Sequence, residues 1–198
     1  MSEKQDKRLQ TLQTLTLDRD AIGLLTAADD DAYFCTPVGA RMIGRVGVDG
    51  IHFCDVPQSG RDTVFAVSPM GDAPYVCAVA DDLEDFLREV YTCGSAAAVE
   101  QLTWMEARQA ADFLRFDRIL QISDDPEALR QANLYFGMEA DTPSDATFRA
   151  QQRQTLETLR TAFSLTPISG IYDHVKAIQR SFDIKTLTFS QEYYDLLG

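Results

Sequence analysis

The stretch from Asp49 to Gly94 constrains the fold more than any other, because it indicates two paired strands, a third strand and a capped helix in immediate succession. Residues 50–56 and 63–67 are short runs that are dense in β-branched and aromatic side chains, which favours strands over helices. The turn formers between the two runs predict an antiparallel hairpin. Residues 75–80 follow a segment with two prolines and predict a third, buried strand. A three-stranded meander is the simplest arrangement of these runs.

The helix expected after the third strand has the clearest local signals in the sequence. Asp81 and Glu84 have the spacing of a capping box, and Gly94 predicts a left-handed stop. Apolar residues recur at helical spacing and should form one stripe against the sheet. They are Leu83, Phe86, Leu87, Val90 and Tyr91. The residues expected to face outward are acidic, namely Asp82, Glu84, Asp85 and Glu89.

Before this stretch, the sequence predicts two further strands. Residues 32–35 and 41–48 have the composition of strands, with β-branched or aromatic residues between turn formers. Three glycines recur at three-residue spacing but lack the strand-then-helix context of a dinucleotide-binding fingerprint. We expect these glycines to form a bulge and a tight turn; they are Gly44, Gly47 and Gly50.

Helices are expected at the N-terminus, where leucines recur over Leu9–Leu17, and through most of the chain after Gly94. The start signals of the later helices are Ser95, the capping-box spacing of Thr103 with Glu106, Asp125 before Pro126, and Pro143. Residues 172–182 fit a further helix. The aromatic segment 189–197 should pack back on the domain, because its exposure would create a large apolar patch. The aspartates at 29–31 are expected to form a turn, since the other ligands of a calcium loop are missing.

Charge is the compositional feature that bears on function. The formal net charge is −13, and residues 51–100 carry nine acidic and two basic side chains. A field of that sign repels nucleic-acid phosphates and anionic membrane surfaces, and it speeds the encounter with a basic protein. The same acidity also keeps a protein soluble, so both interpretations stay open. The first eight residues are charged and precede no long apolar run, so we expect a cytoplasmic protein with neither a secretory signal nor a membrane span.

No set of reactive side chains points to catalysis. The four cysteines have no metal-ligand spacing and three of them lie in apolar runs, which favours reduced, buried cysteines over a metal site or a disulfide. His52 and His174 are lone histidines without a nucleophile motif, and we expect structural or surface roles for both. No Walker-type phosphate loop is present. The sequence therefore predicts no catalytic residues, no metal site and no cofactor.

Three segments of the chain together resemble the SUKH superfamily, which includes the yeast cell-wall assembly regulator and many bacterial proteins. These segments are residues 49–54, 64–70 and 75–87. The shared order is a pair of strands, a third strand that ends in an alanine, and an acidic residue before a helix of Leu/Phe-Leu type. The resemblance covers residues 32–94 and implies a curved antiparallel sheet backed by helices, without catalytic residues. Bacterial members are often immunity proteins that neutralise toxins by binding them.

The predicted fold class is α+β, with a curved antiparallel sheet of about 4–6 strands packed against helices. Residues 1–94 are expected to form the N-terminal helix, the sheet and the capped helix. Residues 95–198 are expected to form a C-terminal helical extension that packs on this core and is not an independent domain.

Two functional hypotheses remain open. The first is a non-catalytic protein-binding domain whose acidic surface takes a basic partner, and its most specific form is an immunity protein that binds a toxin domain. The partner-binding residues it predicts are Asp62, Asp72, Asp82, Glu84, Asp85 and Glu89. The alternative is a small-ligand-binding protein or enzyme with a pocket between the sheet and the helical extension, in which His52 binds the ligand. A deep cleft that gathers His52 with carboxylates would favour the alternative.

Overall fold

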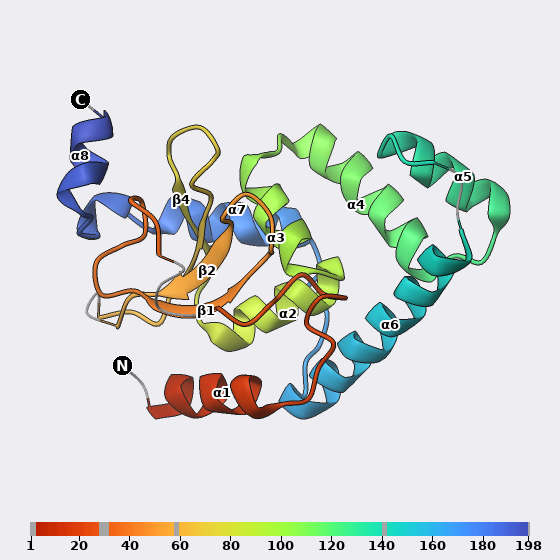
Figure 1. Cartoon of the computed structure of the whole chain (residues 1–198), viewed down its shortest axis with the longest axis horizontal. Helices are drawn as coiled ribbons and strands as arrows, with labels where there is room; N and C mark the ends of the chain where they lie inside the picture. Colours follow the sequence, from red (N-terminus) through yellow and green to blue (C-terminus); the bar gives the residue numbers. More distant parts are fainter. Residues whose placement is uncertain (1–2, 28–31, 58–59, 140–141, 198) are drawn as a thin grey trace.

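Four antiparallel strands form the centre of the structure. The computed structural model describes residues 3–27, 32–57, 60–139 and 142–197. The strands form a meander in the order β1-β2-β3-β4 (Figure 1). They are β1 (Arg41–Arg45), β2 (His52–Asp55), β3 (Val64–Val67) and β4 (Val76–Ala80). The α+β class, the predicted hairpin and the third strand are confirmed, whereas β1 ends before the predicted residue 48.

The turn between β1 and β2 requires a glycine at position 50, because of its backbone conformation and a close neighbour. Asp49 (φ 52°) and Gly50 (φ 68°) both have positive φ, which is the conformation of a two-residue type I′ hairpin turn. The amide of Ile51 closes the turn by donating to the carbonyl oxygen of Val48 at 3.0 Å. A Cβ on Gly50 would lie 2.5 Å from Cζ of Tyr33. The predicted tight turn is therefore confirmed.

Before the turn, the predicted bulge is present, but one predicted strand is not. The pairing register of β1 shifts between Met42 and Gly44, which is the predicted bulge. The strand predicted at residues 32–35 is wrong, because this segment forms a turn. The amide of Tyr33 donates to Oγ1 of Thr36 at 2.8 Å, and the amide of Thr36 donates to the carbonyl oxygen of Tyr33 at 2.9 Å. These local hydrogen bonds use main-chain groups that a strand would give to a sheet.

The helices begin at most of the predicted start signals. They are α1 (Glu3–Thr14), α2 (Leu83–Cys93), α3 (Ala96–Trp104), α4 (Ala107–Ile122), α5 (Pro126–Tyr135), α6 (Pro143–Phe163), α7 (Ile171–Ser181), the short 3₁₀ helix η3 (Ile184–Thr186) and α8 (Gln191–Leu197). Ser95, Asp125 and Thr142 cap α3, α5 and α6 with side-chain oxygens that accept main-chain hydrogen bonds. The predicted capping box of Thr103 with Glu106 is wrong, because α3 continues through Thr103 and Glu106 caps α4.

Helix α2 begins one residue later than its sequence signals indicate. Asp82, not Asp81, is the N-cap, and its Oδ1 accepts a hydrogen bond from the amide of Asp85 at 2.8 Å. The carboxylate of Asp85 accepts from the amide of Asp81 at 3.3 Å, so Asp85 has the reciprocal role that was predicted for Glu84. The predicted stop is confirmed, since Gly94 caps the helix with φ 86°.

The sheet is covered on both faces. One face belongs to a hydrophobic cluster with α1, α2, α3 and the second half of α6, and this cluster includes Phe53, Phe86 and Leu159. The other face packs against Ile178 of α7 and against the C-terminal tail, where Phe189 is 7% exposed. The predicted packing of the tail on the domain is therefore confirmed at Phe189. Both layers together bury every residue of β2, β3 and β4.

Helices α4 and α5 and the beginning of α6 extend away from the sheet, on the right of Figure 1, and we call them the helical arm. The arm joins the rest of the chain at the end of α2. Gln121 Nε2 donates to the carbonyl oxygen of Cys93 at 2.7 Å, and Gln152 Nε2 donates to that of Gly94 at 3.2 Å. A Cβ on Gly94 would overlap the side chain of Gln121, so glycine both ends α2 and admits the arm.

Three further expectations concern the cysteines, membrane spans and the aspartate run. The cysteines are all free and buried, as their apolar surroundings predict. Within the described residues, no helix combines the length and the apolar character that a membrane span requires. The turn predicted at residues 29–31 lies outside the described residues.

Candidate functional site

The six predicted partner-binding residues lie in different surroundings. Asp85 and Glu89 are predicted to face outward, but Glu89 is fully buried and Asp85 is 9% exposed. They lie where α2 meets α7, and both contact His174. The predicted orientation is therefore wrong for these two residues. Burial, and then the neighbouring charge of Asp85, raises the pKa of Glu89 well above its usual value.

The remaining four residues do not form one surface either. Asp82 and Glu84 are half-buried, and Arg8 of α1 forms ion pairs with both. The basic residues of α1 thus compensate the acidic start of α2. Asp62 precedes β3 and is half-buried, whereas Asp72 is exposed in the connection between β3 and β4. Of the six, Asp72 is the one in an exposed position.

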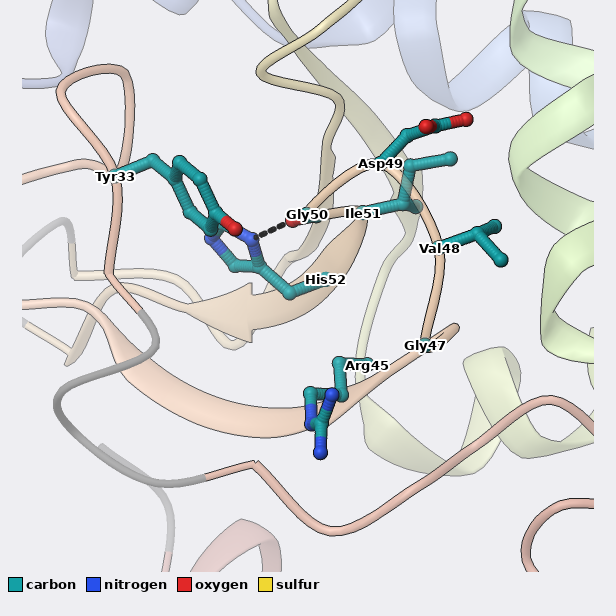
Figure 2. A pocket seen from close by; sticks show the side chains of 8 residues that line it. All are labelled: Tyr33, Arg45, Gly47, Val48, Asp49, Gly50, Ile51 and His52. Carbon is teal, nitrogen blue, oxygen red and sulfur yellow. Dashed lines mark hydrogen bonds between the residues drawn. The ribbon is translucent and has the colours of Figure 1, made fainter.

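His52 has a structural role in the described chain. It is 1% exposed, its Nδ1 lies 2.8 Å from the carbonyl oxygen of Gly50, and its Nε2 lies 3.0 Å from Oγ1 of Thr36. A carbonyl oxygen only accepts, so Nδ1 donates to it, and when the ring is neutral Nε2 accepts from the hydroxyl of Thr36. The ring stacks on Tyr33 with 5.9 Å between centroids (Figure 2). His52 thereby fastens the β1–β2 turn to the loop before β1.

The hollow beside His52 is small. It has a volume of about 150 Å³ and is formed by the β1–β2 turn and Tyr33. Asp49 points away from His52, toward the opposite side of the turn (Figure 2). The ligand pocket predicted around His52 between the sheet and the helical extension is therefore not at this place.

A larger groove lies on the other side of the turn, between the β1–β2 turn, the β3–β4 connection and α3. Its volume is about 320 Å³. The residues that line it include Asp49, Ser68, Met70, Asp72, Glu100 and Trp104. This groove does lie between the sheet and the helical extension, but His52 does not line it. We call it the Trp104 groove.

Hydrogen bonds fix the position of the Glu100 carboxylate in the Trp104 groove. It is 3% exposed, and its Oε1 accepts hydrogen bonds from Ser68 Oγ at 2.7 Å and from Trp104 Nε1 at 2.5 Å. Its Oε2 accepts from Gln101 Nε2 at 2.9 Å. These donors are neutral, so they fix the carboxylate without an opposite charge. Glu100 therefore places a rigid negative charge at the base of the groove.

The groove combines this charge with exposed acidic and apolar groups. Asp49 and Asp72 are exposed at its edges, Trp104 is 38% exposed and Met70 is 69% exposed. Among the described residues that line the groove there is no lysine, arginine or histidine. Carboxylates beside an accessible indole suit a cationic side chain, which gains both charge attraction and a cation–π contact.

Asp72 was among the predicted partner-binding residues, whereas the other acidic and aromatic residues that line the groove were not predicted. Glu100 and Trp104 are four residues apart on α3, a spacing that places two side chains on the same face of a helix. That spacing, together with the presence of a single tryptophan in the chain, is the signal that could have pointed to them. The sequence around Asp49 indicated only a turn. Its place in the groove near α3 depends on the tertiary fold and could not be predicted from neighbouring residues.

The chain was also compared with known proteins. No protein-family model, curated protein or solved structure matches it.

Proposed function

We propose that this chain is a protein-binding domain that uses the Trp104 groove to hold a basic segment of its partner. The observation that carries the proposal is the buried Glu100 carboxylate, which is fixed by neutral donors against Trp104. A carboxylate that is already desolvated and oriented needs little reorganisation when a cation arrives. An arginine of the partner fits this site because its guanidinium both pairs with carboxylates and stacks on aromatic rings.

The charge of the whole chain supports the same kind of partner. A net charge of −13 attracts a basic protein over long range, and the groove then provides the short-range contact. This proposal replaces the predicted acidic face of α2, two of whose carboxylates are buried and two of which pair with Arg8. The basic partner remains the one that the resemblance to SUKH immunity proteins implies, a toxin domain neutralised by binding.

Tryptophan fluorescence tests the proposal directly, because Trp104 is the one tryptophan in the sequence and lines the groove. A short peptide of alternating arginine and glycine would be titrated into the full chain at low and at raised salt. We expect a saturable change in emission that weakens as salt screens the contact. The matching glutamate–glycine peptide should cause no such change.

Three variants locate the binding. Glu100→Gln keeps the acceptor oxygen and removes the charge, and we expect it to weaken peptide binding about tenfold, the equivalent of about 1.4 kcal/mol. The double variant Asp49→Asn with Asp72→Asn should also weaken it. Its control is Asp112→Asn with Asp124→Asn, which makes the same change in net charge at exposed positions that do not line the groove.

The outcomes separate the candidate functions. Equal losses in the groove variants and in the control would mean that net charge alone attracts the peptide, and the groove proposal would be wrong. Saturable binding of free arginine as tight as that of the peptide would favour the small-ligand alternative instead.

A further inference from the structure

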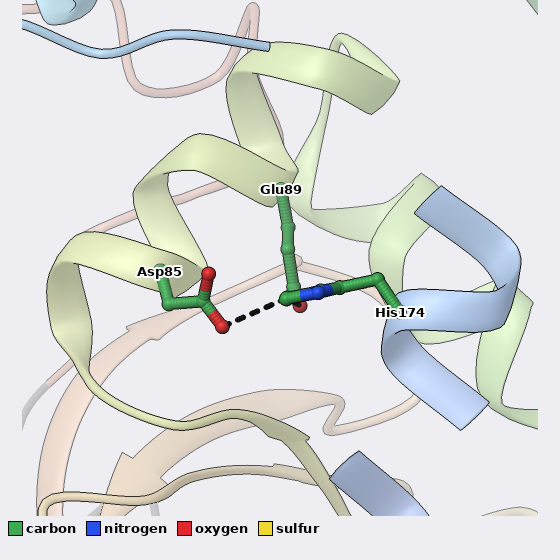
Figure 3. A group of neighbouring side chains, drawn as sticks. All are labelled: Asp85, Glu89 and His174. Carbon is green, nitrogen blue, oxygen red and sulfur yellow. Dashed lines mark hydrogen bonds and ion pairs between the residues drawn. The ribbon is translucent and has the colours of Figure 1, made fainter. Parts of the chain in front are cut away.

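A second cluster of polar side chains joins α2 to α7. Asp85 and Glu89 are four residues apart and lie on the same side of α2, and His174 reaches them from the first half of α7. The three side chains point toward one another (Figure 3). None of them lines the Trp104 groove, so the cluster is a separate feature that the proposed function does not use.

The distances within the cluster are short. His174 Nε2 lies 2.9 Å from Asp85 Oδ2 and 3.5 Å from Glu89 Oε1. One nitrogen and two carboxylate oxygens thus lie within 4.8 Å of one another, the arrangement in which three side chains can share a metal ion. The His174 side chain is 28% exposed, which leaves an approach from solvent on that side.

Glu89 is the unusual member of the cluster. It is fully buried, and neither of its oxygens has a hydrogen-bond partner among the described residues. Buried carboxylates are normally paired or hydrogen-bonded, because a charge without compensation is costly away from water. A buried polar group that lacks a partner and points at two potential ligands indicates that a bound ion completes the site.

Protons alone do not complete the cluster. A proton on His174 Nε2 would serve Asp85, the nearer carboxylate, and would leave both Glu89 oxygens without a donor. A proton on Glu89 Oε1 would have His174 Nε2 as an acceptor at 3.5 Å, the far limit of a hydrogen bond, but Nε2 could then not donate to Asp85. Glu89 Oε2 would still have no partner among the described residues. A cation at the centre serves all three ligand atoms at once.

We propose that Asp85, Glu89 and His174 bind a divalent transition-metal ion, with Zn²⁺ as the expected occupant. Zn²⁺ accepts imidazole nitrogen and carboxylate oxygen together, and three protein ligands leave its fourth position to water. At the usual bond lengths, tetrahedral ligand atoms lie about 3.3 Å apart, and the distances from Nε2 lie on either side of this value. Two carboxylates also balance the double charge of the ion.

The remaining contacts of Asp85 are compatible with this assignment. Oδ2 of Asp85 is the oxygen that faces His174, and it also accepts a longer bond from the amide of Asp81 at 3.3 Å, which leaves a lone pair for the ion. Arg88 Nη1 donates to Oδ1 of Asp85 at 3.2 Å. Such a bond to the second oxygen orients a ligating carboxylate. The ion would connect the helix that packs on one face of the sheet with the helix that reaches its other face, and would therefore bind the folded chain in preference to the unfolded one.

Metal titration of the full chain tests the proposal. The chain would be stripped with a chelator and titrated with Zn²⁺, and with Mg²⁺ as a hard cation that favours oxygen ligands. We expect one Zn²⁺ per chain by calorimetry, a rise in melting temperature with Zn²⁺ and no rise with Mg²⁺. Co²⁺ would serve as a spectroscopic probe, and its spectrum should lack thiolate charge-transfer bands because the ligands are nitrogen and oxygen.

Two variants keep the test independent of folding. Glu89→Gln replaces a ligand carboxylate by a neutral amide of the same shape, so the metal-free variant should melt no lower than the metal-free parent and should lose most of the Zn²⁺ response. His174→Asn should lose the response as well, whereas Asp112→Asn, an exposed change on α4, should retain it. Zn²⁺ binding that persists in both ligand variants, or thiolate bands in the Co²⁺ spectrum, would overturn the proposal.

Discussion

The sheet and the helical arm differ in how completely their residues are enclosed. Every residue of β2, β3 and β4 is buried. In α4, all of which the structure describes, Ala110 is the buried residue. The arm also exposes large apolar side chains, with Ile122 at 57%, Leu134 at 70% and Met138 at 52% exposure.

This difference in burial indicates that the sheet contributes more to the free energy of folding than the arm does. The sheet has helices or the tail on both faces, so the side chains of β2, β3 and β4 lose contact with water. Within the arm, α4 contacts the end of α5 through aromatic pairs, Phe116 with Tyr135 and Phe113 with the C-cap residue Phe136. Local opening should therefore begin in the arm and reach the sheet last.

The largest contrast is expected for matched phenylalanine truncations. Phe53→Ala removes a fully buried ring that lies 4.7 Å from the ring of Phe86, and we expect it to lower the free energy of unfolding by about 3–5 kcal/mol. Phe148→Ala removes a ring of the arm that is 44% exposed and should cost less than about 1 kcal/mol. Urea denaturation measures both. Similar losses at the two positions would remove the distinction between sheet and arm.

A smaller effect is expected at the buried glutamine that anchors α1. Gln5 is 1% exposed, its Nε2 donates to Asp55 Oδ2 at 3.1 Å, and its Oε1 accepts from the amide of Leu83 at 3.0 Å. Gln5→Ala removes these bonds and should lower the free energy of unfolding by about 2–3 kcal/mol. Gln10→Ala changes an exposed residue of the same helix and is the control. If both changes had the same effect in urea, the anchoring role would be wrong.

The smallest effect concerns pH and the arm. Partial burial of the Asp117 carboxyl raises its pKa from 3.8 to about 6, against a hydrogen bond from Gln121 that lowers it. The folded state thus holds this proton more tightly than the unfolded chain does, so the group lowers stability as pH rises above about 4 and has its full effect above about 6. The variant Asp117→Asn lacks this loss of stability with rising pH, because asparagine does not titrate. It should be more stable than the parent at pH 7 by about 1 kcal/mol.

Unfolding free energies of the parent and of Asp117→Asn across this pH range measure the effect. Asp112→Asn, an exposed change on the same helix, should leave the pH dependence of the parent unaltered. A difference between the Asp117 variant and its parent that stayed constant with pH would show that the carboxyl group does not titrate in this range.

The elements that could be predicted are those whose signals are local. The hairpin, the third strand, the stop at Gly94 and the start at Pro126 depend on residues adjacent in the chain. The strand expected at residues 32–35 failed because local hydrogen bonds compete with sheet pairing, a choice that composition does not reveal.

The candidate sites were much harder to predict, because their residues meet only after folding. Asp85 and His174 are separated by 89 positions, and Gln5 and Leu83 by 78. An acidic residue on an amphipathic helix normally faces water, so helical periodicity assigned Glu89 to the wrong side. Its burial results from the packing of α7 against α2, which lies outside any local pattern.

The sequence by itself determined the α+β class, the order of the strands and most helix boundaries, because turn chemistry and apolar spacing act between near neighbours. Only the tertiary structure decided which acidic residues remain exposed and which are buried. The packing of α1, α3 and α7 around the sheet paired Glu84 with Arg8, fixed Glu100 beside Trp104 and enclosed Glu89 beside His174. The physical reason is that the environment of a charge depends on every group within a few ångströms of it, and those groups come from distant parts of the chain.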